Sequence, residues 1–229
     1  MAELTFANEL IGLPTQKPLA VGFYFGNLAF ESGDAEYWYQ LIRLKQPKQI
    51  IEIGSGYSTL IAAMALKKNK EMNEHFSCKH VCIEPYENQW LNQIDVQVIR
   101  SAVEEVDIAF FQELGANDIL FIDSSHVIRP QGDVLYEYLE IIPTLRKGVI
   151  VHIHDIFSPR NYLSDWLCKE IRFWNEQYIL EAFLSGNNAW EVIGSLNYLH
   201  HNHYESLKAV APFLTSEREP GSFYIQRIT

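Results

Sequence analysis

The residues of this 229-residue sequence with the clearest chemical potential surround a glycine-rich turn at 49–60, Q-I-I-E-I-G-S-G-Y-S-T-L. Gly54 and Gly56 lack a Cβ, so the backbone can turn sharply there and approach a ligand closely. Ser58 falls in the first turn of the following helix, where hydroxyl and free N–H groups favour an anionic group such as a carboxylate. Glu52 places a negative charge at the strand end. A ligand that suits both ends carries an ammonium group and a carboxylate, as an amino acid does.

A second acidic residue, Glu84, ends another apolar run, V-C-I-E-P-Y. In a parallel sheet, ligands lie at the carboxyl ends of the strands. A carboxylate at such an end can accept hydrogen bonds from both hydroxyls of a ribose. The alternative interpretation is an acid that starts a helix before Pro85.

Acidic and histidine side chains follow two later apolar runs, I-D-S-S-H and V-H-I-H-D. Alternation along a strand places His152 and His154 on one face, with Asp155 just past the strand. If the two strands are neighbours, Asp123, His154 and Asp155 converge, and two carboxylates with an imidazole can bind a divalent metal or act directly as a base. His126, with a reference pKa of about 6.5, is a candidate base. The alternatives are a helix cap for the aspartates and a hydrogen-bonded core position for His152.

Composition excludes several classes of partner. A formal net charge of -11, without a run of Lys and Arg, argues against nucleic acid and against an anionic membrane surface. No apolar run reaches membrane-spanning length. The three cysteines form no C-x-x-C pair, and the N-terminus lacks the pattern of a signal peptide, so we expect a cytoplasmic protein. A small-molecule substrate fits best, and the composition leaves a homo-oligomer open.

Strand-like and helix-like segments alternate along the chain, which predicts an α/β fold: a Rossmann-like, doubly wound, mostly parallel sheet with helices on both faces. We expect helices at 34–45 and 57–67 and a solvated connection at 67–77. Seven strands are expected, at 49–53, 79–84, 96–100, 118–123, 148–154, 190–193 and 222–228. We expect residues 1–30 to be an extension that packs over the site and residues 31–229 to be one domain.

Two other patterns have mainly structural interpretations. Five aromatic residues recur at near-helical spacing between 166 and 183, which favours core packing over an acceptor pocket. The segment H-H-N-H at 200–203 lacks the periodicity of metal ligands and indicates a solvated loop.

The turn at 52–56 has the pattern E-x-G-x-G, which resembles the first motif of class I S-adenosylmethionine-dependent methyltransferases. It differs from the dinucleotide pattern G-x-G-x-x-G/A, because Thr59 occupies the third glycine position. Three further segments, G-A-N-D-I-L-F-I-D-S-S-H-V, L-R-K-G-V-I-V-H-I-H-D-I-F and W-N-E-Q-Y-I-L-E-A-F-L-S-G, resemble a largely uncharacterised bacterial branch of that family. The resemblance implies S-adenosylmethionine as cofactor and an antiparallel last strand.

The resemblance also implies roles for individual residues. The cofactor site would comprise Glu52, Gly54, Gly56, Ser58, Glu84, Ser101, Ala102 and Asp123, with Ser101 and Ala102 at the adenine edge. The reaction centre would comprise Asp123, His126, His154 and Asp155. Some metal-dependent sugar and polyketide O-methyltransferases have two adjacent acids at the end of the fifth strand. In this sequence the first of those places is His154, and we expect any divalent metal, such as magnesium, at Asp123, His154 and Asp155.

The sequence therefore predicts methyl transfer to a small molecule, at a hydroxyl, by in-line displacement with acid–base or metal assistance. Two alternatives stay open. A metal-dependent oxygenase or hydroxylase on the same sheet would use the cluster at Asp123, His154 and Asp155 for redox chemistry. A non-catalytic cofactor-binding partner would bind S-adenosylmethionine without needing the aspartates.

Overall fold

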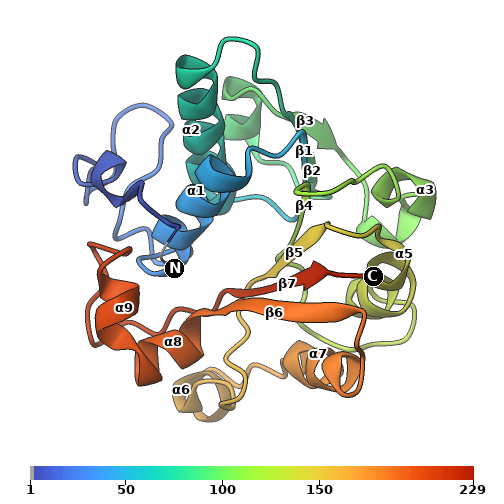
Figure 1. Cartoon of the computed structure of the whole chain (residues 1–229). Coiled ribbons are helices and arrows are strands. Elements are labelled where there is room, and N and C mark those ends of the chain that lie inside the picture. Colours follow the sequence, from blue (N-terminus) through green and yellow to red (C-terminus); the bar gives the residue numbers. More distant parts are fainter. Residues whose placement is uncertain (1–2) are drawn as a thin grey trace.

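A computed structural model describes residues 3–229 of the chain, and a seven-stranded sheet forms its centre (Figure 1). The strand order is β3-β2-β1-β4-β5-β7-β6. Neighbouring strands are parallel except for β7, which is antiparallel to both β5 and β6. The strands are β1 (Gln49–Ile53), β2 (Lys79–Ile83), β3 (Gln97–Ile99), β4 (Ile119–Ile122), β5 (Ile150–Ile153), β6 (Trp190–Ser195) and β7 (Phe223–Arg227). The predicted fold class and the antiparallel last strand are confirmed.

Helices cover both faces of this sheet, as Figure 1 shows. Strands β1, β4 and β5 are buried along their whole length, and their alternating side chains feed two separate cores. One core contains Ile50, Phe121 and Trp38 of α1. The other contains Ile51, Leu120 and Leu180 of α7. The helices are α1 (Asp34–Lys45), α2 (Tyr57–Met72), α3 (Ile108–Phe111), α4 (Asp133–Tyr136), α5 (Ile142–Thr144), α6 (Ser164–Cys168), α7 (Glu176–Leu184), α8 (Leu196–Asn202) and α9 (Tyr204–Lys208), with a π-helical turn at Glu137–Ile141 between α4 and α5 and 3-10 turns at Ala7–Glu9, Gln89–Gln93 and Val103–Glu105.

Helix α2 is longer than predicted. It continues to Met72, into the segment expected to be a solvated connection. Asn69 explains this extension, because its side chain is buried and donates a hydrogen bond to the Ile42 carbonyl of α1. An ion pair one turn apart, Lys68 with Glu71 at 3.2 Å, lies on the exposed side. The polar sequence after residue 67 therefore forms the exposed end of α2, which the buried side chain of Asn69 holds against α1.

One other local prediction was wrong. The segment H-H-N-H lies mostly within α8 instead of a loop, and His200 is buried. The aromatic segment 166–183 is two helices, α6 and α7, separated by irregular backbone. The near-helical spacing of its aromatic residues spans this break.

The segment before α1 packs on the sheet's first core. Phe23, Phe25 and Phe30 are buried, and the Phe25 ring stacks on Phe213 at 4.1 Å between centroids. The Tyr24 hydroxyl lies 3.2 Å from that of Tyr57 at the start of α2. Residues 1 and 2 of the expected extension lie outside the described residues. Within residues 3–229, no helix has the length and apolar character needed to cross a membrane.

Candidate active site

The glycine-rich turn after β1 has the backbone that its sequence predicts. Gly54 has φ +92°, and a Cβ on it would lie 2.5 Å from the Asp123 carbonyl oxygen. Any side chain there would collide with the end of β4. A Cβ on Gly56 would meet nothing within 4 Å, so that glycine borders open space. The Gly56 N–H donates to the Thr59 hydroxyl at 3.1 Å. Gly54 thus allows β1 and β4 to approach, while Gly56 leaves room for a ligand.

Glu52 supports this turn from beneath. Its carboxylate is fully buried and accepts hydrogen bonds from the hydroxyls of Ser58 and Thr59, each at 3.0 Å. The His80 Nε2 of β2 lies 2.5 Å from the same carboxylate. Glu52 is not among the residues that line the cavities at this end of the sheet. It therefore fixes the first turn of α2 in place.

A cavity of about 420 Å³ lies at the carboxyl ends of β1, β2 and β4. Its wall includes Gly54, Glu84, Ala102 and Asp123. The Glu84 carboxylate accepts hydrogen bonds from the Ser55 hydroxyl at 2.7 Å and the Tyr86 N–H at 3.0 Å, which fixes its orientation. Ser101 is not part of this wall, and its hydroxyl donates to Glu105 at 2.7 Å. Of the two residues expected at the adenine edge, only Ala102 reaches the cavity.

A second cavity, of about 440 Å³, adjoins the first and shares Ser55 and Asp123 with it. Most of its other lining residues are apolar or aromatic. They come from the segment before α1, from the start of α2 and from the region after β2: Pro18, Ala20, Val21, Tyr24, Phe30, Tyr57, Leu60 and Trp90, with Lys17, Ser58 and Asn88 as polar members. Asp123 is therefore a carboxylate on the wall of both cavities.

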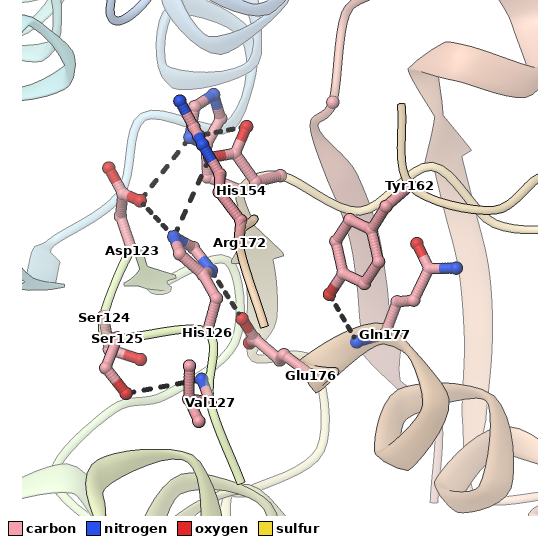
Figure 2. Close-up of polar contacts among 12 residues, drawn as sticks. Asp123, Ser124, Ser125, His126, Val127, His154, Tyr162, Arg172, Glu176 and Gln177 are labelled. Atoms are coloured by element: carbon pink, nitrogen blue, oxygen red, sulfur yellow. Dashed lines mark hydrogen bonds and ion pairs between the residues drawn. The ribbon is translucent and has the colours of Figure 1, made fainter. Parts of the chain in front are cut away.

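His126 lies among three carboxylates from distant parts of the chain (Figure 2). Its Nε2 is 3.2 Å from Asp123 and 3.7 Å from Asp155, and its Nδ1 is 2.7 Å from Glu176. The backbone of His126 has φ +59°, and that of Asp155 has φ +58°. Both are in the left-handed region, which directs these side chains back toward each other across the ends of β4 and β5.

Glu176 is a member of this cluster that the sequence analysis missed. It is fully buried at the start of α7 and also accepts a hydrogen bond from the Tyr138 hydroxyl at 2.9 Å. The N–H groups of Asn175 and Glu176 donate to the His126 carbonyl, and the Asn175 side chain accepts from the N–H of Ile128. An acid in the first turn of a helix is common because it interacts favourably with the helix dipole, so nothing in the sequence indicated this contact.

Aromatic side chains cover the same histidine. The Trp174 ring lies 4.3 Å from that of His126. Arg172 stacks on both Trp174, at 4.5 Å, and Trp166, at 4.3 Å. Both tryptophans are partly exposed. They cover the reaction centre, so core packing describes them poorly.

His154 occupies a different place from His126. Its Nδ1 lies 3.5 Å from Asp123 and 3.7 Å from Asp155, and its Nε2 lies 3.9 Å from Asp34 of α1. Asp34 is a further buried acid that the sequence analysis missed, and it accepts hydrogen bonds from the N–H groups of Gly221 and Ser222.

The charges in this cluster shift one another's protonation. Burial favours neutral histidines, but hydrogen bonds to Asp123 and Glu176 outweigh it and hold the pKa of His126 well above its ordinary value. For His154, the charges of Asp155 and Asp123 outweigh burial and raise the pKa to about 10. Burial favours a neutral Asp123, yet His154 and His126 lower its pKa. Burial raises the pKa of Asp155. The cluster therefore pairs two imidazolium groups with carboxylates of unequal basicity.

One set of atoms in the cluster suits a metal ion. Asp123, His126 and Asp155 each offer a ligand atom, and these atoms lie within 4.8 Å of one another. The expected set had His154 in place of His126. The structure brings His154 near both aspartates but groups His126 with them, because the left-handed backbone at 126 directs its ring inward.

Residues 51–156 match the family model Methyltransf_24, described as a methyltransferase domain. This segment is a methyltransferase domain. It runs from within β1 to just beyond β5 and includes most of the residues at both ends of the site. The match covers less than half of the chain and agrees with the resemblance to methyltransferases that the motifs indicate.

Relatives of the methyltransferase domain add little detail. An uncharacterised protein of Archaeoglobus fulgidus is 34% identical over 102 residues, which are 42% of this chain and 44% of that protein. The chain thus matches less than half the length of that relative. Among solved structures, an O-methyltransferase from Bacillus cereus in complex with SAH has 13% identity and a TM-score of 0.47, covering 84% of this chain and 80% of that chain. CalS11, a TDP-rhamnose 3'-O-methyltransferase, has 13% identity and a TM-score of 0.48, covering 84% and 76%. At these scores the two structures carry no argument about this chain.

Proposed function

We propose that this methyltransferase domain transfers the methyl group of S-adenosylmethionine to a hydroxyl of a small molecule. One observation carries the proposal. Asp123 lines both adjoining cavities and belongs to the cluster with His126 and Asp155. A carboxylate–imidazole cluster at the junction of two cavities is where an acceptor hydroxyl must meet a methyl donor.

The first cavity and the adjoining part of the second fit the cofactor. Gly56, which follows the shared Ser55 and lines the second cavity, leaves open space beside the N-terminus of α2, which suits the carboxylate of the methionine portion. Glu84, held by Ser55, can accept hydrogen bonds from ribose hydroxyls, and Ala102 leaves room for a flat ring. S-adenosylmethionine supplies an electrophilic methyl group on a sulfonium. We assign Glu52 and Ser58 a supporting role, because both hold the helix start.

The second cavity suits the acceptor. Its mostly apolar wall would hold a hydrophobic or aromatic body and exclude water, while Asp123 orients the hydroxyl. The acceptor O–H bond breaks as the new O–CH₃ bond forms, and the S–CH₃ bond of the cofactor breaks to leave S-adenosylhomocysteine. We assign the released proton to Asp155, whose raised pKa makes it the stronger base of the two aspartates. The charge of His126 stabilises the developing negative oxygen.

The donor set of Asp123, His126 and Asp155 also fits a divalent cation. Such an ion, when bound, would lower the pKa of the acceptor hydroxyl. Holding the ion would require a neutral His126 and would make the Asp155 carboxylate a ligand, so the metal-bound site would not use these two residues as the metal-free site does.

Calorimetric titration tests the cofactor first. We expect micromolar binding of S-adenosylmethionine and S-adenosylhomocysteine to the full chain, each measured with and without magnesium or manganese. Gly54→Ala should abolish binding, because the added Cβ would collide with the end of β4. Glu87→Ala, an exposed position near the same cavity, is the matched control.

Methyl transfer from radiolabelled S-adenosylmethionine to a panel of hydroxylated aromatic and apolar compounds then tests the acceptor. Transfer to oxygen would support the proposal. Binding of the cofactor together with transfer only to amines or carbon would contradict the choice of acceptor atom. Failure to bind either compound would contradict the proposal as a whole.

A further inference from the structure

A second group of metal-ligating side chains lies outside the reaction centre. His200 and His201 near the end of α8 meet Glu219 of the segment before β7. Each offers a ligand atom, and these atoms lie within 4.8 Å of one another. The His201 Nε2 is 2.8 Å from Glu219, and the two histidine rings are 5.0 Å apart. Two imidazoles and a carboxylate from separate segments therefore face a common point.

Two buried polar atoms beside this point have no partner among the described residues. His200 is 5% exposed, and its Nδ1 makes no hydrogen bond. Asn197, one turn earlier on α8, is 1% exposed, and its Oδ1 makes none either, while its Nδ2 donates to Glu219 at 2.8 Å. A buried polar atom without a partner loses its hydrogen bonds to water and gains none in return, which destabilises the fold. Two such atoms beside a shared carboxylate indicate that a ligand belongs there.

We infer that His200, His201 and Glu219 form a binding site for a transition-metal ion of the zinc class. Two neutral imidazoles and one carboxylate are a ligand set that zinc prefers, with water completing a tetrahedron, whereas magnesium and calcium favour oxygen ligands. Asn197 holds the Glu219 carboxylate from behind, as partners of metal ligands commonly do.

The site would connect α8 to the wall of the reaction centre. Glu219 is two residues before Gly221, whose N–H donates to Asp34 and whose carbonyl accepts from the N–H of Ile156 at 2.7 Å. A Cβ on Gly221 would lie 3.1 Å from the Cα of Asp155. A bound ion would hold the segment against which Asp155 packs, so its role is structural.

Cobalt is a suitable probe, because Co²⁺ replaces zinc and absorbs visible light strongly in a tetrahedral site. The full chain is freed of metal with a chelator and titrated with Co²⁺, then with Zn²⁺ in competition. We expect visible absorption bands at one equivalent that Zn²⁺ removes. His201→Ala and Glu219→Gln should each weaken binding by at least about 100-fold, since even a partner of a ligand contributes about 10–100-fold. Both side chains are partly exposed, so the variants should fold.

Two controls separate this site from other binding. Asp123→Asn, which removes a ligand of the reaction centre, should leave the cobalt spectrum unchanged. His75→Ala removes an 89% exposed histidine and should also change nothing. Absence of cobalt bands in the wild-type chain would overturn the inference. So would bands that survive His201→Ala and disappear in Asp123→Asn, because the ion would then belong to the reaction centre.

Discussion

The two ends of the proposed active site are built in different ways. At the cofactor end, the turn from Glu52 to Thr59 makes most of its contacts within a few residues, and its shape depends on a glycine at φ +92°. At the reaction centre, His126 contacts Glu176, 50 residues away, and Asp155, which lies just beyond the end of β5. A turn whose residues lie close together in the sequence can form a binding surface by its backbone conformation alone. A proton-transfer site requires several charged side chains at one point, and here only the folded sheet and α7 bring them together.

The two ends also differ in electrostatics. At the cofactor end, the Glu84 carboxylate receives a hydroxyl and a backbone N–H. At the reaction centre, His126 faces three carboxylates within 3.7 Å. Removing one partner from a buried charge cluster leaves the others uncompensated, so substitutions at this centre should have larger and less local effects.

The largest expected effect separates chemistry from binding. His126→Asn should lower kcat for methyl transfer by about 10²–10⁴-fold, because it removes a charged member of the proton-transfer cluster. The affinity for S-adenosylmethionine should change by less than about threefold, since His126 does not line the cofactor cavity. Radiolabel transfer and calorimetry measure the two quantities. A parallel loss of both would show that the two ends are one energetic unit.

The next effect concerns stability. Glu176→Ala should lower the free energy of unfolding by about 3–5 kcal/mol, because it leaves the buried charge of His126 without its closest partner. Glu176→Gln, which keeps one acceptor for the Tyr138 hydroxyl, should cost less. Urea unfolding followed by circular dichroism gives both values. Glu170→Gln, at a 47% exposed glutamate on the same side of the site, is the control and should change little.

A smaller effect is expected at the cofactor end. Glu84→Ala should weaken binding of S-adenosylmethionine by about 1–3 kcal/mol, because the ribose loses hydrogen bonds to a charged acceptor. At saturating cofactor, kcat should stay close to that of the wild type. Calorimetry beside initial-rate measurements checks both. Unchanged affinity would remove Glu84 from the cofactor site.

The sequence predicted the fold well because its signals are local. Each of the seven strands is a short apolar run, and the glycine at 54 is required by a backbone angle that few other residues adopt. The strand ends at Asp123 and Asp155 followed from the same pattern. Their approach depended only on β4 and β5 being neighbours, which is the case.

The rest of the site has no such local signal. Glu176 looks like an ordinary first-turn acid, and Asp34 looks like the acidic start of α1. The contacts of Glu176 and Asp34 depend on which distant loop packs against the N-terminus of each helix. The His126 ring points toward Asp123 and Asp155 from a left-handed backbone. The sequence does not predict such a backbone at a non-glycine residue. Long-range contacts of this kind appear only once the chain is folded.

His152, on β5, and His154, just after it, allow a similar comparison between two nearby histidines. Both rings pack near Phe30 and Phe121, so their apolar surroundings are similar. His154 also faces Asp123 and Asp155, which raise its pKa to about 10, whereas burial and the charge of His154 hold the pKa of His152 well below its ordinary value. Opposite shifts from one apolar environment show that the carboxylates decide the protonation of this strand end.

The signs of these shifts predict opposite effects on stability. A histidine with a raised pKa stabilises the fold fully below about pH 6.5, and that contribution is lost as pH rises from there toward 10, with a slope of at most about 1.4 kcal/mol per pH unit. A histidine with a lowered pKa contributes above about pH 6.5 and loses that contribution in acid. With a chelator present, His154→Gln should therefore flatten the alkaline decline of the unfolding free energy, and His152→Gln should flatten the acid decline. If both variants changed the same limb of the profile, burial rather than the carboxylates of the reaction centre would control these charges.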